Sequence, residues 1–420
     1  MRRATRQRPS VSTEQDWRLL LALFCVGTLI EITAWGHMQA FTPLFLSREL
    51  AVDAADVPFW TGVLAALPLA IAVPLAPFWG ALADRYSRKL IIVRSLFAES
   101  LAYAVASLSG SLLAFVVVRL IMGFAFGNNA LVVAVISLVT LERRLGTAVG
   151  VFTAMFPIGL SVGPLMGSGL IALGGPRLML AVDAALCLFA ATMLLLFVRE
   201  PARDPAALSV GIRERLGTIF ALVARMPSIR WNFVLWFLIS GGVAAMDPYL
   251  PVLITDLYQG SSLALTIGVV LAIFGAASAI CTPFTPRLVD RFGASRVLLF
   301  ACLVLALVAF VSPFAPTVAI VAAILLLRAA PQAATATTLF THLARHAPRE
   351  HRAGVMALSP LPRNLALLIA PLAGSALSAL GLGAVFALGG LFFLTAAVVS
   401  RVLERAERTD ALPLARGSEA

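Results

Sequence analysis

Residues 163–168 read Gly-Pro-Leu-Met-Gly-Ser, and residues 370–375 read Ala-Pro-Leu-Ala-Gly-Ser. Other pairs recur in the same register: Asp84-Arg85 with Asp290-Arg291, Arg119 with Arg328, Pro43 with Pro251, and 142–146 with 350–354. Their spacing is about 206–209 residues, close to half of the 420-residue chain. One coincidence of this kind would be weak, but five in register predict a chain of two similar halves in tandem.

The composition places these halves in a membrane. Hydrophobic residues make up 60% and charged residues 13%, against about 45–50% and 25% in a soluble domain. Apolar runs long enough to cross ~30 Å of hydrocarbon cover 18–45, 58–80, 89–109, 111–140, 146–172, 177–198, 231–256, 262–285, 294–313, 315–340, 352–378 and 381–403. They are too long and continuous for barrel strands, so we expect an all-α integral membrane protein with twelve transmembrane helices.

Six helices return the chain to its starting side, so the repeat predicts two six-helix bundles related in parallel. We expect an N-terminal bundle over 1–198, a cytoplasmic linker over 199–230, and a C-terminal bundle with a cytoplasmic tail over 231–420. The linker is either a short helix on the membrane surface or an irregular charged loop. The first run is too long for a secretory signal and carries Glu31, so we expect it to be retained.

The net charge of +11 would suggest nucleic acid in a soluble protein. With both termini placed in the cytoplasm, 27 of the 32 basic residues fall on the inner side, and only Arg48 and Arg177 fall outside. This is the positive-inside rule, so we expect the lipid bilayer and no nucleic acid as a partner. The remaining three arginines, Arg119, Arg328 and Arg363, lie within helices and are functional candidates.

The sequence disfavours a cofactor, a metal site and an enzymatic activity. The four cysteines have no paired spacing, which disfavours disulfides and zinc. Lys89 is the single lysine and is not in a Walker A loop. His342, His346 and His351 cluster before the eleventh run, and we interpret them as loop histidines rather than metal ligands. A membrane enzyme would need acidic or nucleophilic residues at a membrane face, and we find no such cluster.

The loop after the second run reads Gly-Ala-Leu-Ala-Asp-Arg-Tyr-Ser-Arg-Lys over residues 80–89. It resembles the cytoplasmic loop signature of the major facilitator superfamily, with Ser87 where a second glycine is usual. The resemblance covers essentially the whole chain and implies alternating access between two halves. It also implies that the loop and its C-terminal copy form a cytoplasmic gate, made of Gly80, Asp84, Arg85, Arg88, Lys89, Asp290 and Arg291. A plain positive-inside loop is the alternative.

Arg119 with Gly123 resembles the fourth-helix motif of the proton-coupled members of this family. At 1.5 Å per residue, Arg119 and Glu31 lie at a similar depth, roughly 12–15 Å from the outer surface. An arginine near the bilayer centre costs ~2.5–3.5 kcal/mol on insertion scales and needs a partner, for which Glu31 is the best candidate. We expect this pair to handle the coupling proton; a static ion pair is the alternative.

The fifth run carries Gly150, Gly159, Gly163, Pro164 and Gly167, with Ser168 in place of a final glycine. The pattern resembles the antiporter signature of the drug/proton exchangers, which implies export. We expect these glycines to form a closely packed face between the halves, with a bend at Pro164. Generic packing of small residues in membrane helices is the alternative.

In the family that the chain resembles, the first, fourth, seventh and tenth helices face a central cavity. Residues that share faces of these helices, together with two in the eleventh, form the expected substrate cavity: Trp35, Met38, Phe126, Asn129, Asp247, Arg328, Gln332, Thr335, Arg363 and Asn364. Ordinary packing explains Trp35 and Met38 equally well. Glu99 and Asp183 lie in the third and sixth helices, and we interpret them as structural hydrogen-bonding groups.

We therefore expect a proton-coupled antiporter that exports small amphipathic or drug-like compounds by alternating access. Its partners would be a small-molecule substrate, protons and lipid, and it would act as a monomer in a bacterial cytoplasmic (inner) membrane. Two alternatives stay open. One is an exporter of a specific metabolite such as a sugar or siderophore, which three buried arginines would suit if the substrate is anionic. The other is a proton symporter for uptake.

Overall fold

The computed structural model describes residues 16–125, 129–199, 222–348 and 352–416, and the regular structure in these ranges is helical. The α-helices are α1 (Trp17–Arg48), α2 (Val57–Arg85), α3 (Arg88–Leu108), α4 (Leu112–Gly123), α5 (Asn129–Val139), α6 (Leu145–Phe197), α8 (Pro227–Met246), α9 (Leu250–Leu257), α10 (Leu263–Cys281), α11 (Thr285–Phe292), α12 (Ala294–Val311), α13 (Val318–His346), α14 (Arg352–Leu358), α15 (Pro360–Leu377) and α16 (Leu382–Arg416). Short 3-10 helices join some of them: η1 (Glu142–Arg144), η3 (Asp247–Tyr249), η4 (Thr282–Phe284), η5 (Ser312–Phe314) and η6 (Ser378–Leu380).

Within the described residues, ten helical segments are long and apolar enough to cross a membrane. One of them, α6, contains two crossings, because the chain turns at Gly174 and Gly175 before Pro176. Gly175 has φ +79°, a conformation that glycine adopts without strain. Helices α4 and α5 both lie within the expected run 111–140, which accounts for one further crossing. The arrangement confirms the all-α fold with twelve crossings.

Helix starts follow from local capping. The Ser87, Ser111 and Thr317 hydroxyls accept hydrogen bonds from the backbone N–H groups three residues later, at the beginnings of α3, α4 and α13. A side-chain acceptor at this position satisfies a donor that the helix itself cannot. Ser87, which stands where the family signature has a glycine, therefore has a structural role as the N-cap of α3.

Some helix ends differ from the expectation. Helix α13 runs to His346 instead of residue 340, and α16 runs to Arg416 instead of residue 403. Hydropathy marks where the apolar run ends, but the backbone continues to form hydrogen bonds beyond it when the following residues favour a helix. Of the expected linker over 199–230, residues 200–221 lie outside the described residues, and α8 already begins at Pro227.

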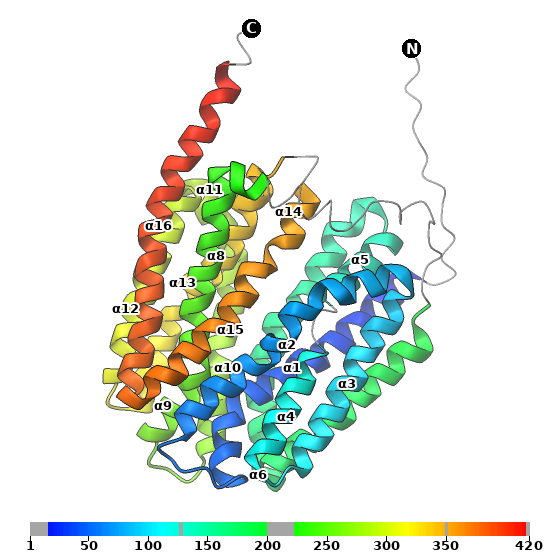
Figure 1. Ribbon diagram of the computed structural model, residues 1–420, viewed down its shortest axis with the longest axis vertical. Helices are drawn as coiled ribbons and strands as arrows, with labels where there is room; N and C mark the ends of the chain where they lie inside the picture. The colour runs from blue at the N-terminus through cyan, green and yellow to red at the C-terminus, as the bar shows by residue number, and fades with distance from the viewer. Residues whose placement is uncertain (1–15, 126–128, 200–221, 349–351, 417–420) are drawn as a thin grey trace.

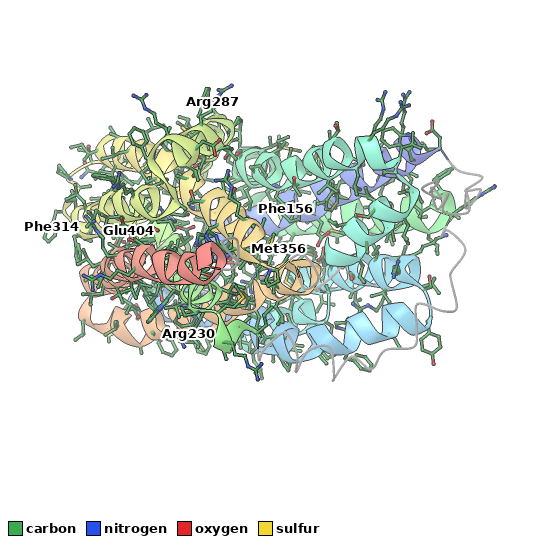
Figure 2. The ribbon with its side chains drawn as sticks, turned by 90° about the horizontal axis from the view of Figure 1, so that it is seen from above. Phe156, Arg230, Arg287, Phe314, Met356 and Glu404 are labelled. Carbon is green, nitrogen blue, oxygen red and sulfur yellow. The ribbon has the colours of Figure 1, made fainter. Side chains whose placement is uncertain are left out.

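The start of α1 and the end of α16 lie toward the same end of the molecule, which we call the proximal end (Figure 1). The opposite end is the distal end. Helices α1–α6 form a first bundle and α8–α16 a second. Figure 1 shows the bundles converging toward the distal end. Seen from the proximal end, Phe156 of α6 and Met356 of α14 lie near the boundary between the bundles (Figure 2).

The apolar cores follow the same arrangement. One large cluster of buried side chains extends through both bundles, from Phe41 and Phe115 in the first to Tyr249 and Leu305 in the second. A smaller cluster around Phe24 and the described parts of α3, α5 and α6 belongs to the first bundle alone. Another, around Ile229 and Leu343, belongs to the second alone. The two bundles therefore share a core in only part of their length.

Many large apolar side chains remain exposed on the outside of the bundles, such as Leu108, Leu173, Phe300 and Phe314. A water-soluble protein would not expose so much apolar surface, whereas a lipid environment favours it. Together with the twelve crossings, this surface makes the chain a multi-pass membrane protein.

Candidate functional site

Three glycines of the first arm of α6 lie directly on α1. A Cβ on Gly159 would come 2.9 Å from Ile32 Cβ, and one on Gly163 would come 2.9 Å from the Thr33 carbonyl oxygen. The expectation that these glycines line the face between the halves is therefore wrong. They bring α6 into backbone contact with α1 of their own bundle, which larger residues would prevent.

The ends of this glycine face differ from each other. A Cβ on Gly167 would come 2.7 Å from the His37 ring and 2.8 Å from the Phe41 ring. A Cβ on Gly150 would meet nothing within 4 Å, so packing does not require glycine there. The close contact with α1 therefore covers Gly159 to Gly167 and does not reach the proximal part of α6.

The bundles meet through the neighbouring face of α6. A Cβ on Gly268 of α10 would come 2.5 Å from the Pro164 carbonyl oxygen and 2.7 Å from Ser168 Cβ. Further toward the proximal end, Gly275 of α10 faces Ser161 in the same way. At both positions, a glycine of α10 in the second bundle faces a serine or a backbone carbonyl group of α6 in the first.

A second contact between the bundles repeats the first. A Cβ on Gly62 of α2 would come 2.6 Å from the Pro371 carbonyl oxygen and 2.9 Å from Ser375 Cβ. The Ser375 hydroxyl also donates to the Phe59 carbonyl oxygen at 2.7 Å. Gly62 precedes Gly268 by 206 residues, and Ser168 precedes Ser375 by 207. The two contacts are therefore copies of one another, and together we call them the distal closure.

Arg119 of α4 is buried, with 1% of its surface exposed. Its Nε donates to the Leu64 carbonyl oxygen of α2 at 2.8 Å, and its guanidinium lies 5.7 Å from the Trp35 ring centre. Trp35 is one helical turn from Glu31, which is half-buried on α1. Glu31 is also near enough to Glu99 of α3 for their charges to act on each other.

In the second bundle, the Arg328 guanidinium of α13 pairs with the Asp247 carboxylate of η3 at 2.5 Å. Arg328 is fully buried and lies 5.2 Å from the Phe274 ring centre. Within the described residues, its Nε and Nη1 and the Gln332 side-chain oxygen have no hydrogen-bond partner. The Thr335 hydroxyl instead bonds to its own helix, at the Gln332 carbonyl oxygen.

The other expected cavity residues differ in their exposure. Met38 is buried in the shared core, Asn364 is half-buried, and Arg363 is exposed. Phe126 and the side chain of Asn129 lie outside what the structure describes.

Of the expected gate residues, Gly80 lies in α2, and the side chains of Asp84 and Arg85 lie outside the described part of the chain. Arg88 and Lys89 are half-buried at the start of α3. In the C-terminal copy, exposed Asp290 pairs with Arg345 of α13 at 2.8 Å, and Arg291 lies beside Phe292. This ion pair joins two helices of the same bundle.

Sequence reasoning missed the buried contact between α1 and α6 at His37. His37 Nδ1 lies 2.7 Å from Asp183 Oδ1, and neither residue is exposed. The signal was present: two ionisable residues lie in apolar runs at comparable distances from the distal ends of their helices.

The expectation of loop histidines is wrong for His342 and His346, which lie in α13, where buried His342 stacks on His346 and contacts Asn232. His351 lies outside the described residues.

The family model described as Major Facilitator Superfamily matches residues 23–269 and 260–418. The chain belongs to the Major Facilitator Superfamily. The two matches together cover nearly all of the described helices. The chain is thus a membrane transporter and not an enzyme.

Relatives within the superfamily align over nearly their full length. "Multidrug resistance protein MdtG" of Enterobacter lignolyticus (strain SCF1) is 24% identical over 400 residues, covering 95% of each chain. The protein of the same name from Serratia proteamaculans (strain 568) is 25% identical over 387 residues, covering 92% of this chain and 93% of the relative.

Solved structures of the superfamily share the fold. A bacterial homologue of the human lysosomal transporter Spinster, in an inward-facing and unoccupied conformation, superposes with a TM-score of 0.76 at 14% identity, covering 94% and 98% of the two chains. The human organic anion transporter MFSD10 (TETRAN) gives a TM-score of 0.64 at 20% identity, covering 92% and 100%.

Proposed function

We propose that this protein is a proton-driven exporter of small amphipathic or drug-like compounds. The names of its aligned relatives, multidrug resistance proteins, support this substrate class. We place it in a bacterial cytoplasmic membrane with the proximal end inside, because most basic residues would then lie on the cytoplasmic side. In this orientation the distal closure seals the outer side.

The observation that carries the proposal is the contact of α6 with α1. Helix α1 bears Glu31, and α6 bears Pro164 and Ser168 of the distal closure. Gly159 and Gly163 let the backbones of the two helices touch, so a displacement of α1 moves α6 with it. A change of charge on Glu31 can therefore act on the contact that opens and closes the outer side.

The cycle follows from this connection. Glu31 takes up a proton from the outside, its attraction for the Arg119 guanidinium weakens, and the outer side closes. Opening toward the cytoplasm then returns the proton as substrate binds. Each pH unit across the membrane supplies ~1.4 kcal/mol per proton, and each 100 mV supplies ~2.3 kcal/mol per charge. These forces sustain a substrate gradient without nucleotide.

A second candidate function is export of an anionic metabolite. Arg328 favours it, because a buried guanidinium with two nitrogens lacking partners among the described residues suits a carboxylate or phosphate group. The third guanidinium nitrogen, Nη2, pairs with the Asp247 carboxylate in this structure. The two functions share one fold and differ in the charge of the substrate.

Transport in proteoliposomes tests the proposal. Purified protein is reconstituted, a pH gradient is imposed, and accumulation is measured for cationic drugs, anionic metabolites and sugars. We expect uphill movement of at least one amphipathic compound that stops when an ionophore collapses the gradient. Accumulation of anions alone would favour the second function, and accumulation of sugars alone, or of nothing under any gradient, would refute both.

A further inference from the structure

The His37–Asp183 pair connects α1 to the second arm of α6. His37 Nδ1 and Asp183 Oδ1 are 2.7 Å apart, and both side chains are at most 1% exposed. When Nδ1 carries the proton, the imidazole donates to the carboxylate. Within the described residues, His37 Nε2 and Asp183 Oδ2 have no hydrogen-bond partner. An incompletely satisfied buried ionic pair is costly for stability, so its presence calls for another explanation.

Of the charged groups on the two helices of the pair, Arg177 of α6 and Glu49 at the end of α1 already pair with each other at 2.6 Å. Tyr103 of α3 and Cys187 of α6 lie within electrostatic range of Asp183, and Glu99, Glu31 and Arg119 lie beyond them in the same bundle. Helices α5 and α10, which also pack against α1, carry no charged residue. The charged residues of α2 lie at the proximal end of that helix. Asp256 is the one charged residue of α9, and it lies near the distal end of α9. Protonation of His37 therefore changes the local charge balance decisively.

The second bundle supplies an internal control. By the repeat, His37 corresponds to the stretch 243–246 of α8, and Asp183 to residues 389–392 of α16. There the corresponding helices, α8 and α16, meet through apolar groups, since a Cβ on Gly389 would lie 2.6 Å from Met246 Cγ. The buried residues Ala244 and Ala245 continue this contact. The fold thus forms this helix contact without charge, so the His37–Asp183 pair is not needed to build it.

The pair lies directly behind the distal closure. His37 contacts Gly167, and the next residue, Ser168, faces Gly268 of the other bundle. We propose that His37 and Asp183 form a proton-binding site, separate from Glu31 and Arg119, that senses the outer pH and stabilises the distal closure when protonated. The inference rests on the transport cycle proposed above in that the distal end must open and close, but not on the identity of the substrate.

The direction of the pH dependence follows from the burial of the pair. In the distal-closed state the imidazolium neutralises the Asp183 carboxylate at 2.7 Å in a dry site. Loss of the proton leaves a buried charge uncompensated, which strongly destabilises that state. Parting of the bundles at the distal end removes α10 from Pro164 and Ser168, directly beside the His37 contact. The proposal requires that water then solvate the carboxylate. Low pH therefore favours the distal-closed state and high pH the distal-open one.

The test measures the distance between the distal ends of the bundles as a function of pH. Spin labels are attached at L108C and F314C, whose native leucine and phenylalanine are exposed at the distal ends of the two bundles. The background carries Cys281→Ser, because the other three cysteines are buried. Distances are recorded by pulsed electron paramagnetic resonance in lipid nanodiscs between pH 5 and pH 8. We expect the short-distance population to increase as the pH falls.

The decisive variant is the apolar double substitution His37→Leu with Asp183→Ala, since an apolar contact already serves at the corresponding place in the second bundle. The double substitution is made in a Glu31→Gln background, which removes the response that the transport cycle assigns to Glu31. We expect it to fold and to lose the pH response, while Glu31→Gln alone and the control His346→Gln retain it. An unchanged pH response in the double variant, or no response in the unmodified protein, would overturn the proposal. Its failure leaves the export assay unaffected, so the two claims are tested separately.

Discussion

Ser168 on α6 lies against Gly268 on α10, and the repeat-related Ser375 on α15 lies against Gly62 on α2. In each contact a serine of one bundle faces a glycine of the other. Ser168 departs from the glycine of the family signature, and Gly268 provides the space that it needs. The distal closure is thus a pair of matched contacts, each of which requires that one partner have no side chain.

Gly268→Val is expected to prevent the distal closure, because its Cβ would lie 2.5 Å from the Pro164 carbonyl oxygen. Overpacking of this kind costs about 1–3 kcal/mol, which shifts an equilibrium between two states by about 5- to 150-fold. Distal spin-label distances should move toward the long population, and transport should fall. A short-distance population equal to that of the unmodified protein would contradict this account of the closure.

Gly62→Val is expected to have the same effect, because the two contacts are repeat-related and both must form. A double variant with Gly268→Val should add little to either single variant, since one blocked contact already holds the bundles apart. Transport rates of the three variants check this. If Gly62→Val transports at the normal rate, the closure depends on the contact of α6 with α10 alone.

Gly163→Ala tests the contact of α6 with α1. Its methyl group would come 2.9 Å from the Thr33 carbonyl oxygen, a backbone atom that cannot move aside alone. We expect a loss of about 1–3 kcal/mol in thermal or denaturant stability together with reduced transport. The matched control is Gly169→Ala on the same helix, where a Cβ meets nothing within 4 Å. Equal effects of the two substitutions would show that the contact does not matter.

The sequence determined much of this arrangement in advance. Hydropathy predicted the crossings, because lipid requires long helical runs, and the repeat predicted the paired bundles. It could not tell which face of α6 meets which neighbour, because glycine spacing is the same whether the partner is α1 or α10. His37 and Asp183 stand out in the sequence as ionisable residues in apolar runs, but 146 positions separate them, so nothing in the sequence showed that they pair with each other.

Arg328→Gln tests the charge of the substrate. The substitution removes the buried guanidinium and leaves Asp247 without its partner, so the site changes from neutral to acidic. We expect transport of anionic compounds to fall at least about tenfold, equivalent to 1.4 kcal/mol, while cationic compounds are retained or improved. Competition between a carboxylate compound and its amide, before and after the substitution, measures this. Unchanged selectivity would place substrate recognition away from Arg328.

The central claim is that protons move against the substrate through Glu31, and proton flux driven by substrate tests it most directly. Proteoliposomes containing a pH-sensitive dye are given a substrate gradient with no imposed pH difference. We predict a proton movement opposite in direction to the substrate in the unmodified protein, and none in Glu31→Gln, although the variant still binds substrate. Proton movement in the same direction as the substrate, or opposite movement that persists in Glu31→Gln, would contradict the account.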